Sequence, residues 1–380
     1  MMPYLRKKKL LFIVNDASFF LSHRAPIATQ ALSKGYDVHV ATPTCGAERK
    51  IQALGFAFHS IQFDRGGTNP FKDFSTLFHL WKLIRKLSPD VVHLVTIKPV
   101  LYGGLVCRLL GVGAVVSAIS GLGSVFIAQS LIDRFVRWGV TFLYRIALSH
   151  GNQIVIFQNP DDLKLLQDNT GVLASKCRLI KGSGVCLSSY RYIDPPLGRL
   201  RVVMASRLLR EKGVWEFVEA ATILKQQGTA AEFLLAGDVD LGNPSSLTEE
   251  DLRNIENQGV VTIVGYQKSL ASFFSLSHIV VLPSYREGLP KVLIEAAAVG
   301  RPVVTTDVPG CRDAIEPETT GVLVPPRNAS LLARAIKRLL DDSVERRSMG
   351  ERARLLAERE FGLEHVVKTH MEIYRELLGT

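Results

Sequence analysis

Cysteine is scarce in this chain of 380 residues, and its pattern excludes a disulfide framework. The cysteines are an odd number and include no Cys-x-x-Cys pair: Cys45, Cys107, Cys177, Cys186 and Cys311. Disulfide-rich domains and zinc knuckles both depend on paired cysteines. We therefore expect a reducing compartment and neither of these two kinds of stabilisation.

The chain also lacks the low apolar content of disordered proteins, since 47% of its residues are hydrophobic and 22% are charged. This composition can supply two hydrophobic cores of about 150 to 200 residues each. The basic stretch Arg6–Lys9 resembles the start of a signal peptide, but the apolar run after it, Leu10–Val14, is too short for one. We expect no export signal.

A long uninterrupted apolar run is missing as well. Residues 109–132 carry no charge over 24 positions, but four glycines, at 111, 113, 121 and 123, divide them. Within this run, Ala114–Ser120 has the composition of a buried strand of a parallel sheet. We expect this strand here rather than a membrane-spanning helix.

Acidic residues are few in the first half of the chain. Residues 1–199 hold 24 Lys and Arg against 11 Asp and Glu, a net of +13, whereas residues 200–380 hold 22 against 25, a net of −3. A basic first half favours an anionic partner, either nucleic acid or an anionic membrane surface. Zinc-finger spacing, RNP-type aromatic motifs and basic repeats are absent, which speaks against nucleic acid, although a smooth phosphate-binding face needs no motif.

What the chain does have is a regular alternation of short apolar runs with amphipathic stretches, the pattern of repeated βαβ units. The fold class is α/β, with two Rossmann-like doubly wound domains. In the first series we predict strands at Lys9–Asn15, Asp37–Pro43, Phe56–Phe63, Val91–Val95, Ala114–Ser120, Gln153–Gln158 and Arg178–Lys181. In the second we predict strands at Arg201–Ala205, Glu232–Ala236, Val260–Val264, Ile279–Pro283, Pro302–Thr306 and Gly321–Val324.

The stretch Ser183–Gly198 contains Pro195-Pro196 and two glycines, and is predicted to be a linker. We place the first domain at residues 1–190, the second at 199–360, and at 361–380 a helix that packs back toward the first domain. Everything after Asn328 is predicted to be helical. Tandem doubly wound domains place the carboxyl ends of their strands toward a shared cleft, where open α/β sheets bind ligands.

The most specific segment runs from Pro283 to Glu295, a buried strand that we expect to turn into a helix at Gly288 with Pro290 in its first turn. Its two carboxylates, Glu287 and Glu295, would lie about 12 Å apart at 1.5 Å per residue. That spacing suits the two ends of a nucleotide diphosphate-sugar. The N–H groups of the helix start offer an anion seat between them, and a ribose diol is a plausible partner for a buried Glu295. The alternative is that both are surface charges.

A second segment, Met204–Gly213, closes the first strand of the second series and brings two cations, Arg207 and Lys212, to a strand end next to a helix start at Val214. Such cations fit a diphosphate clamp. The alternative is that they are ordinary exposed loop cations.

Together, Arg-x4-Lys-Gly and the later Glu-Gly-x-Pro-x4-Glu resemble the retaining GT-B glycosyltransferases grouped as family 4, over nearly the whole chain. The resemblance implies that Arg207 and Lys212 contact the donor diphosphate, Glu287 reaches donor-sugar hydroxyls and Glu295 binds the ribose. It also implies that the turn Gly265-Tyr266 holds the base. We take Arg207, Lys212 and Glu287 as catalytic, and add Gly288, Leu289 and Pro290 to the donor-nucleotide site.

A narrower similarity rests on four segments: His23-Arg24-Ala-Pro, Arg65 with Asn69-Pro70-Phe71, Gly121–Phe126 and Pro283–Pro290. These segments resemble the N-acetylgalactosaminyltransferases that extend undecaprenyl-diphosphate-linked sugars. We place Ala17, Ser18, His23 and Gly121 near the acceptor or its phosphates. Many family members have a His after the fifth strand, where this chain has Ile119-Ser120-Gly121, so no catalytic His is carried over.

Two further patterns have simpler explanations. Asp238-Val-Asp240 has the D-x-D spacing of metal-dependent transferases, but no His or further carboxylate lies nearby, so we predict no metal and no cofactor. His93 closes an apolar strand, and a lone His there is more often structural.

Residues 125–148 combine aromatic residues with Arg134, Arg137 and Arg145 at helical spacing. This pattern fits docking on anionic lipid headgroups, which Arg6–Lys9 would reinforce, and it fits equally an ordinary helix that covers the sheet.

These features lead to one hypothesis with three alternatives. We expect an enzyme that moves a hexose, such as GalNAc, from a UDP-sugar to an undecaprenyl-diphosphate-linked saccharide at the cytoplasmic face of the membrane, without metal and without nucleic acid. The alternatives are a GT-B-type UDP-sugar epimerase, a basic nucleic-acid-binding protein and an inactive partner that kept the fold.

Overall fold

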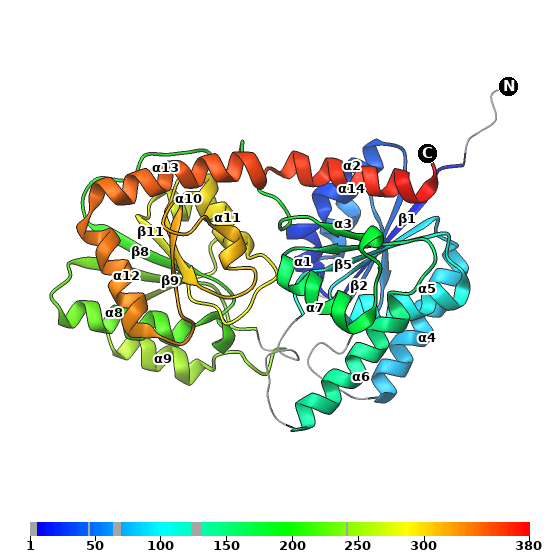
Figure 1. Ribbon diagram of the computed structural model, residues 1–380, viewed down its shortest axis with the longest axis horizontal. Helices are drawn as coiled ribbons and strands as arrows, with labels where there is room; N and C mark the ends of the chain where they lie inside the picture. The colour runs from blue at the N-terminus through cyan, green and yellow to red at the C-terminus, as the bar shows by residue number, and fades with distance from the viewer. Residues whose placement is uncertain (1–5, 45, 64–69, 123–130, 241) are drawn as a thin grey trace. The chain divides into compact units, whose positions relative to one another are not determined.

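The computed structural model describes residues 6–44, 46–63, 70–122, 131–240 and 242–380. The chain divides into two compact units, the first formed by Met1–Ser183 with Glu364–Thr380 and the second by Gly184–Leu363 (Figure 1). The boundary therefore falls at Ser183 rather than at residue 190, and the predicted linker belongs to the second unit. Residues 364–380 belong to the first unit.

The first unit is built on a parallel sheet with the strand order β3-β2-β1-β4-β5-β6-β7. Its strands are β1 (Lys9–Val14), β2 (Asp37–Thr42), β3 (Ala57–Ser60), β4 (Val91–Val95), β5 (Ala114–Ile119), β6 (Gln153–Phe157) and β7 (Cys177–Leu179). Strands β4, β5 and β6 are buried along their whole length, as expected for a parallel sheet that is covered on both faces.

Helices cover both faces of this sheet. One face packs against α1 (Ala17–His23), α2 (Ala25–Ser33), α3 (Glu48–Ala53) and α14 (Leu363–Leu378). The other packs against α4 (Pro70–Leu87), a π-helix at Pro99–Gly103, α5 (Gly104–Leu110), α6 (Leu131–Ala147) and α7 (Pro160–Thr170). Asn159 caps α7 by accepting the Asp162 amide (2.8 Å), and Pro160 opens the helix.

The second unit repeats the plan with the strand order β10-β9-β8-β11-β12-β13, again parallel. Its strands are β8 (Leu200–Ala205), β9 (Ala231–Ala236), β10 (Thr262–Gly265), β11 (Ile279–Leu282), β12 (Val303–Thr306) and β13 (Gly321–Val324). Its helices are α8 (Val214–Gln226), α9 (Glu249–Asn257), α10 (Leu270–Ser275), α11 (Lys291–Ala298), α12 (Ala329–Asp341) and α13 (Ser343–Glu360).

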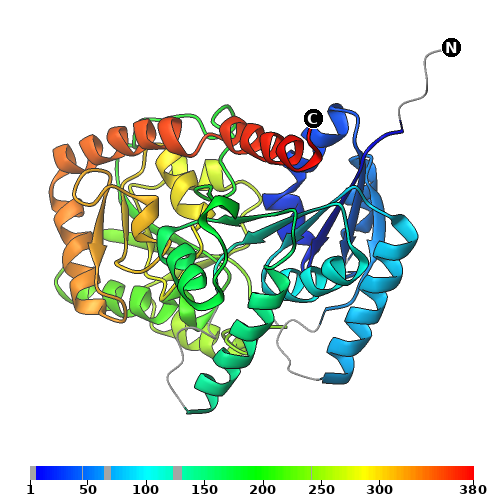
Figure 2. The ribbon, with the colours of Figure 1, turned by 45° about the vertical axis from the view of Figure 1, so that its right-hand side comes forward.

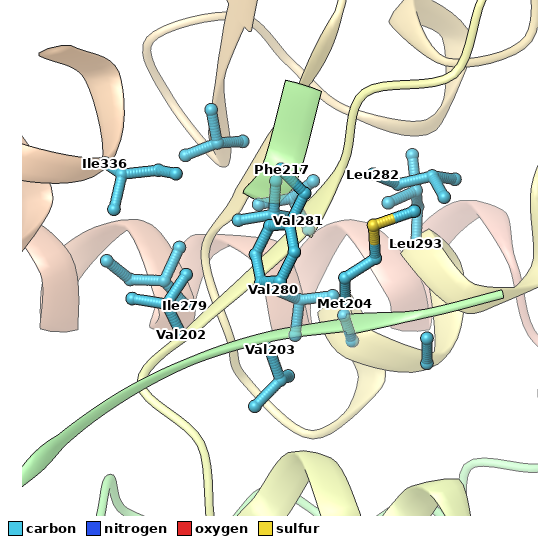
Figure 3. Close-up of a cluster of buried hydrophobic side chains, with 14 of the residues drawn as sticks. Val202, Val203, Met204, Phe217, Ile279, Val280, Val281, Leu282, Leu293 and Ile336 are labelled. Atoms are coloured by element: carbon cyan, nitrogen blue, oxygen red, sulfur yellow. The ribbon is translucent and has the colours of Figure 1, made fainter. Parts of the chain in front are cut away.

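The core of the second unit holds β8 and β11 in register, and these two strands lead into the segments singled out from the sequence. Figure 3 shows Phe217 of α8, Leu293 of α11 and Ile336 of α12 packed with side chains of β8 and β11. Val202 pairs with Ile279 and Val203 with Val280. Removing one large side chain such as Phe217 would cost about 3 to 5 kcal/mol, so the two strand ends are rigidly placed.

The predicted α/β fold class is confirmed, and each predicted strand corresponds to an observed strand with ends that differ by at most three residues. The strand expected within the uncharged run 109–132 is β5. Residues 123–130 lie outside the described part of the chain, so of the helix expected at 125–148 the structure describes α6.

Candidate functional site

The candidate site in the second unit lies where the strand order reverses, between β8 and β11. In a doubly wound sheet the segments that follow two such strands diverge, which leaves room for a ligand at the carboxyl ends of the strands. Arg207 follows the end of β8 by two residues, and the segment Pro283–Pro290 follows β11 directly. The two motifs found in the sequence are therefore at the same edge of the same sheet.

Lys212 and Glu287 form an ion pair across this edge. The ammonium Nζ of Lys212 contacts Oε1 of Glu287, and the Ser284 hydroxyl donates to the same oxygen (2.8 Å). The two side chains are 18% and 12% exposed. Gly213 makes the approach possible, because its φ of 76° is in the left-handed region and a Cβ there would overlap the Pro283 carbonyl.

The loop that carries Glu287 is supported from a third strand. The Glu287 amide donates to the Pro309 carbonyl (3.1 Å), and a Cβ on Gly310 would lie 2.6 Å from the Glu287 and Gly288 carbonyl oxygens. Beside them, burial and then the Glu287 charge raise the pKa of the Cys311 thiol to about 12. Sequence reasoning missed this support, although the Pro309-Gly310 turn signal was visible after β12.

Arg207 is also paired with a carboxylate, and this changes the interpretation of the D-x-D pattern. Its Nη1 lies 2.7 Å from Oδ2 of Asp240, with the side chains 54% and 13% exposed. Asp240 is thus the ion-pair partner of Arg207, the residue predicted to contact the donor diphosphate. Within the described ranges, no group of three or more His, Cys, Asp and Glu is placed to hold a metal ion. Metal independence stays a prediction.

The predicted start of the helix after this loop is wrong by about three residues. We expected the turn into the helix at Gly288 with Pro290 inside the first turn, but α11 begins at Lys291 and Pro290 is its N-cap, with ψ at 119°. An N-cap residue keeps an extended backbone, which Pro290 adopts readily. The N–H groups that a helix start offers to an anion therefore begin at Lys291.

Glu295 is buried, with 4% of its surface exposed, so the surface-charge alternative is wrong for this residue. Its Oε1 accepts a hydrogen bond from the Tyr190 hydroxyl (2.8 Å) and lies 3.5 Å from the Lys291 ammonium. Burial raises the pKa of the Glu295 carboxyl, while Lys291 and the Tyr190 hydrogen bond oppose that shift. The sequence predicts a ribose diol as the partner of this carboxylate, and the structure adds a protein partner, Tyr190.

The predicted base-binding turn lies near this pair. Gly265 ends β10 with its backbone in the left-handed region, and the Tyr266 side chain is 69% exposed. Burial and Glu295, followed by Cys186 and Tyr266, raise the pKa of the Tyr190 hydroxyl. Five residues named from the sequence, Arg207, Lys212, Glu287, Glu295 and Tyr266, thus belong to one end of the second unit.

In the first unit, the residues assigned to the acceptor lie after β1 and β5. Ala17 is buried and Ser18 exposed in the first turn of α1, which Asp16 caps by accepting the Phe19 amide (2.9 Å). His23 ends α1, with its ring stacked on Phe19 at 4.0 Å. Gly121 follows β5 and Ser120 with a φ of 112°.

Arg24 joins two segments at this end of the first sheet, and His93 lies in the middle of β4. Arg24 is 2% exposed, and its Nη2 lies 3.4 Å from the Ser120 hydroxyl, so the His23-Arg24 turn and the segment after β5 are joined. Burial lowers the pKa of Arg24 to about 10. His93 is buried and hydrogen-bonds the Tyr374 hydroxyl of α14 (2.5 Å), which fits the structural role preferred for it.

Comparison with known families finds two matches along the chain. Residues 9–159 match the family described as glycosyl transferase 4-like, and residues 193–356 match glycosyl transferases group 1. Each match lies within one unit and covers most of its parallel strands.

Individual proteins show the same similarity. The N,N′-diacetylbacillosaminyl-diphospho-undecaprenol alpha-1,3-N-acetylgalactosaminyltransferase of Campylobacter jejuni is 30% identical over 355 residues, which are 88% of this chain and 92% of that protein. The UDP-Gal:alpha-D-GlcNAc-diphosphoundecaprenol alpha-1,3-galactosyltransferase of Escherichia coli is 25% identical over 286 residues, 72% of each chain. The crystal structure of a glycosyltransferase from Rickettsia africae has a TM-score of 0.76 at 19% identity, and the match covers 98% of this chain and 99% of that one.

Proposed function

The chain belongs to the group 1 glycosyltransferase family, and from this premise we propose that it moves an N-acetylhexosamine such as GalNAc from a UDP-sugar to an undecaprenyl-diphosphate-linked saccharide. The observation that carries the proposal is the Lys212–Glu287 pair at the switch point of the second sheet. It combines a cation for a diphosphate with a carboxylate for sugar hydroxyls. The names of the two curated relatives support a lipid-diphosphate acceptor.

The chemical step needs stabilisation of the leaving group. When the bond between the anomeric carbon and the diphosphate oxygen breaks, that oxygen gains negative charge, and a positive group already in place lowers the barrier. An ammonium group has three N–H donors, so Lys212 can hold Glu287 and a phosphate oxygen together. The half-exposed Arg207 and the N–H groups at the start of α11 add to this stabilisation without a metal ion.

The remaining site residues orient the donor. Glu287, fixed by Lys212 and Ser284, accepts hydrogen bonds from donor-sugar hydroxyls. The acceptor hydroxyl attacks the anomeric carbon from the face on which the diphosphate leaves and gives its proton to the leaving diphosphate oxygen. The new glycosidic bond forms with retention of configuration, and UDP is released. Glu295 holds the ribose, and Tyr266 with Gly265 holds the base. In the first unit the acceptor lies along Ala17, Ser18, His23 and Gly121.

The enzyme docks on the cytoplasmic face of an anionic membrane through the first unit. Among the described residues, none of the helices is long and apolar enough to cross a bilayer. On α6, however, Trp138 is 72% and Phe142 is 52% exposed, and their rings stack at 6.2 Å. Exposed aromatic side chains next to cations are typical of interfacial helices.

Helix α4 extends this surface, which sequence reasoning missed. Phe71, Phe74 and Phe78 are 86%, 72% and 54% exposed, and their spacing puts them on one side of α4. The helix carries four cations and one carboxylate, Asp73, which pairs with Lys98 (3.0 Å). Figures 1 and 2 show α4 and α6 on the same side of the first sheet. We call Phe71, Phe74, Phe78, Trp138 and Phe142 the aromatic surface.

Contacts within the first unit reduce the predicted contribution of Arg6–Lys9 to docking. Lys9 Nζ donates to the Leu87 carbonyl (3.0 Å), and Arg6 and Lys8 each lie 3.9 Å from Asp90, so part of this charge is balanced within the unit. Each cation near an anionic surface contributes about 1 kcal/mol.

Vesicle flotation tests the docking proposal. Binding should increase when phosphatidylglycerol is added to phosphatidylcholine vesicles, and the double variant Phe74→Ser/Trp138→Ser should lose most of it. The matched control is Leu355→Ser, which removes an apolar side chain that is 61% exposed on α13 of the second unit. Equal binding of the double variant and the wild type would contradict the assignment.

Mass spectrometry tests the reaction itself. With UDP-GalNAc and a polyprenyl-diphosphate-linked saccharide, the product should be the acceptor extended by one N-acetylhexosamine together with UDP. UDP-GalNAc alone should stay unchanged, whereas its conversion to another UDP-sugar would support the epimerase alternative. Salt-dependent binding of DNA or RNA without transfer would support the nucleic-acid alternative.

A further inference from the structure

The segment 184–198, expected to be a linker, is held on the second unit by hydrogen bonds along its length. The Val185 amide donates to the Phe361 carbonyl (2.8 Å), and the Leu363 amide returns a bond to Val185 (3.0 Å). Further along, Arg354 Nη1 donates to the Tyr190 carbonyl (2.6 Å). We call residues 184–198 the strap.

A buried cation fixes the strap beyond Tyr190. Arg301 is 0% exposed, and its guanidinium donates to backbone carbonyls of Phe274 (3.0 Å), Ser275 (2.7 Å) and, in the strap, Ile193 (2.7 Å). Burying a charge is costly unless it is fully hydrogen-bonded. The strap backbone is therefore hydrogen-bonded to the second unit on both sides of Tyr190, at Val185 and at Ile193.

Tyr190 is one of the strap side chains that pack against the core of the second unit, together with Val185 and Leu187. Its hydroxyl donates to Glu295 Oε1 at 2.8 Å, across 105 residues of sequence, and the Lys291 ammonium lies 3.5 Å from the same oxygen. Both contacts fall on Oε1 of a carboxylate that is 4% exposed. The orientation of the carboxyl group is thereby set by the strap on one side and by the first turn of α11 on the other.

We infer that Tyr190 is a positioning residue for recognition of the nucleotide ribose: its O–H occupies Glu295 Oε1 and directs Oε2 toward the ribose hydroxyls. The inference rests on the proposed role of Glu295 in holding the ribose. It makes the strap part of the nucleotide site rather than a connection between domains. Tyr190 touches the carboxylate and not the substrate, so it acts through Glu295.

The physical effect of this arrangement is selectivity for a ribose diol. A hydrogen bond to a charged group contributes about 1.5 to 3 kcal/mol, and a site built around it discriminates against an analogue that lacks the hydroxyl. This corresponds to a preference for UDP over 2′,3′-dideoxy-UDP of about 10-fold to 150-fold. Without the Tyr190 hydroxyl, Glu295 can rotate or take up a proton, and the preference falls.

Calorimetry with UDP and 2′,3′-dideoxy-UDP distinguishes a positioning role of Tyr190 from a purely structural one. In Tyr190→Phe we expect the preference for UDP to fall several-fold, with the affinity for 2′,3′-dideoxy-UDP unchanged within about twofold, since only the ribose contact is disturbed. The variant lacks the hydrogen bond that favours the ionised form of Glu295. When the pH is lowered, the variant should therefore lose affinity for UDP at a higher pH than the wild type does.

Two further variants make each outcome decisive. Tyr192→Phe is the matched control, since this strap hydroxyl lies 3.3 Å from Asp194 instead of Glu295, and it should keep the wild-type preference. Glu295→Gln should lose the preference. If Glu295→Gln loses it and Tyr190→Phe keeps it, or if Tyr190→Phe weakens both nucleotides equally, the positioning role is overturned while the ribose site stands. If Glu295→Gln keeps the preference, the ribose assignment and this inference are both overturned.

Discussion

Replacing Lys212 by Ala removes the cation that the proposed mechanism places at the leaving diphosphate. The side chain is 18% exposed and pairs with a carboxylate that is 12% exposed, so its charge acts in a partly desolvated site. At an effective dielectric constant of about 20, two unit charges 4 Å apart interact by about 4 kcal/mol. This is the scale of the loss expected when the leaving diphosphate is no longer stabilised.

We therefore expect turnover to fall by about 10² to 10³, as for the loss of one preorganised charge-stabilising group. Because the charge on the leaving oxygen develops mainly in the transition state, kcat should fall more than KM rises. The loss of Lys212 also leaves the Glu287 carboxylate without this counter-ion next to an anionic donor. Glu287→Gln should for that reason cost less in the Lys212→Ala background than in the wild type.

The assay is UDP release with the lipid-linked acceptor under saturating donor. Lys337→Ala is the matched control, since this lysine pairs with Asp341 (3.0 Å) on the exposed side of α12 in the same unit. It should keep wild-type turnover within about twofold, as expected for a surface ion pair. Near-normal turnover of folded Lys212→Ala would refute the role of the ion pair in catalysis.

Two further predictions concern metal and pH. Turnover in excess EDTA should equal turnover without it, whereas strict dependence on added manganese would reassign Asp240 from Arg207 to a metal. Burial and Arg24 lower the pKa of His370 to about 3, and burial followed by His370 and Arg24 lowers that of His93. The two histidines therefore stay neutral in the folded state, whereas in the unfolded chain they take up protons as the pH falls below about 6.5. The free energy of unfolding then decreases by up to about 1.4 kcal/mol per pH unit for each histidine. Urea unfolding of Trp215→Phe, followed by the Trp81 and Trp138 fluorescence of the first unit, should show a loss of about 3 kcal/mol from these two histidines between pH 7.5 and 5.5. His370→Leu should halve this loss, and an unchanged loss would contradict the assignment.

The fold was predictable because parallel strands buried on both faces have a strong sequence signal. Runs such as Leu10–Val14 and Ile279–Leu282 are continuous apolar segments between helical stretches, and both lie in strands at the predicted places. The family resemblance carried by Arg207, Lys212, Glu287 and Glu295 is confirmed by the family matches and by the relative from Campylobacter jejuni.

The partners of these residues could not be predicted, because they come from distant parts of the chain. Asp240 is 33 residues from Arg207, and Tyr190 is 105 residues from Glu295. No periodic pattern records such contacts, and prolines and glycines made the strap look like a free linker. Its order depends on Arg301 and Arg354, whose role as donors to backbone carbonyls is visible only in three dimensions.

The aromatic surface illustrates a different limit. Phe71, Phe74 and Phe78 have the same spacing as buried helix residues, and sequence alone does not tell which side of α4 faces the sheet. Leu80 and Ile84 are the residues that face inward, which leaves the three phenylalanines exposed.

The most direct test is a crystal structure of the protein with UDP. We predict that the diphosphate contacts Lys212 and Arg207 and that the ribose hydroxyls bind Glu295, all at the carboxyl ends of β8 and β11. A nucleotide bound elsewhere on the chain, or bound here with its diphosphate out of reach of Lys212, would contradict it.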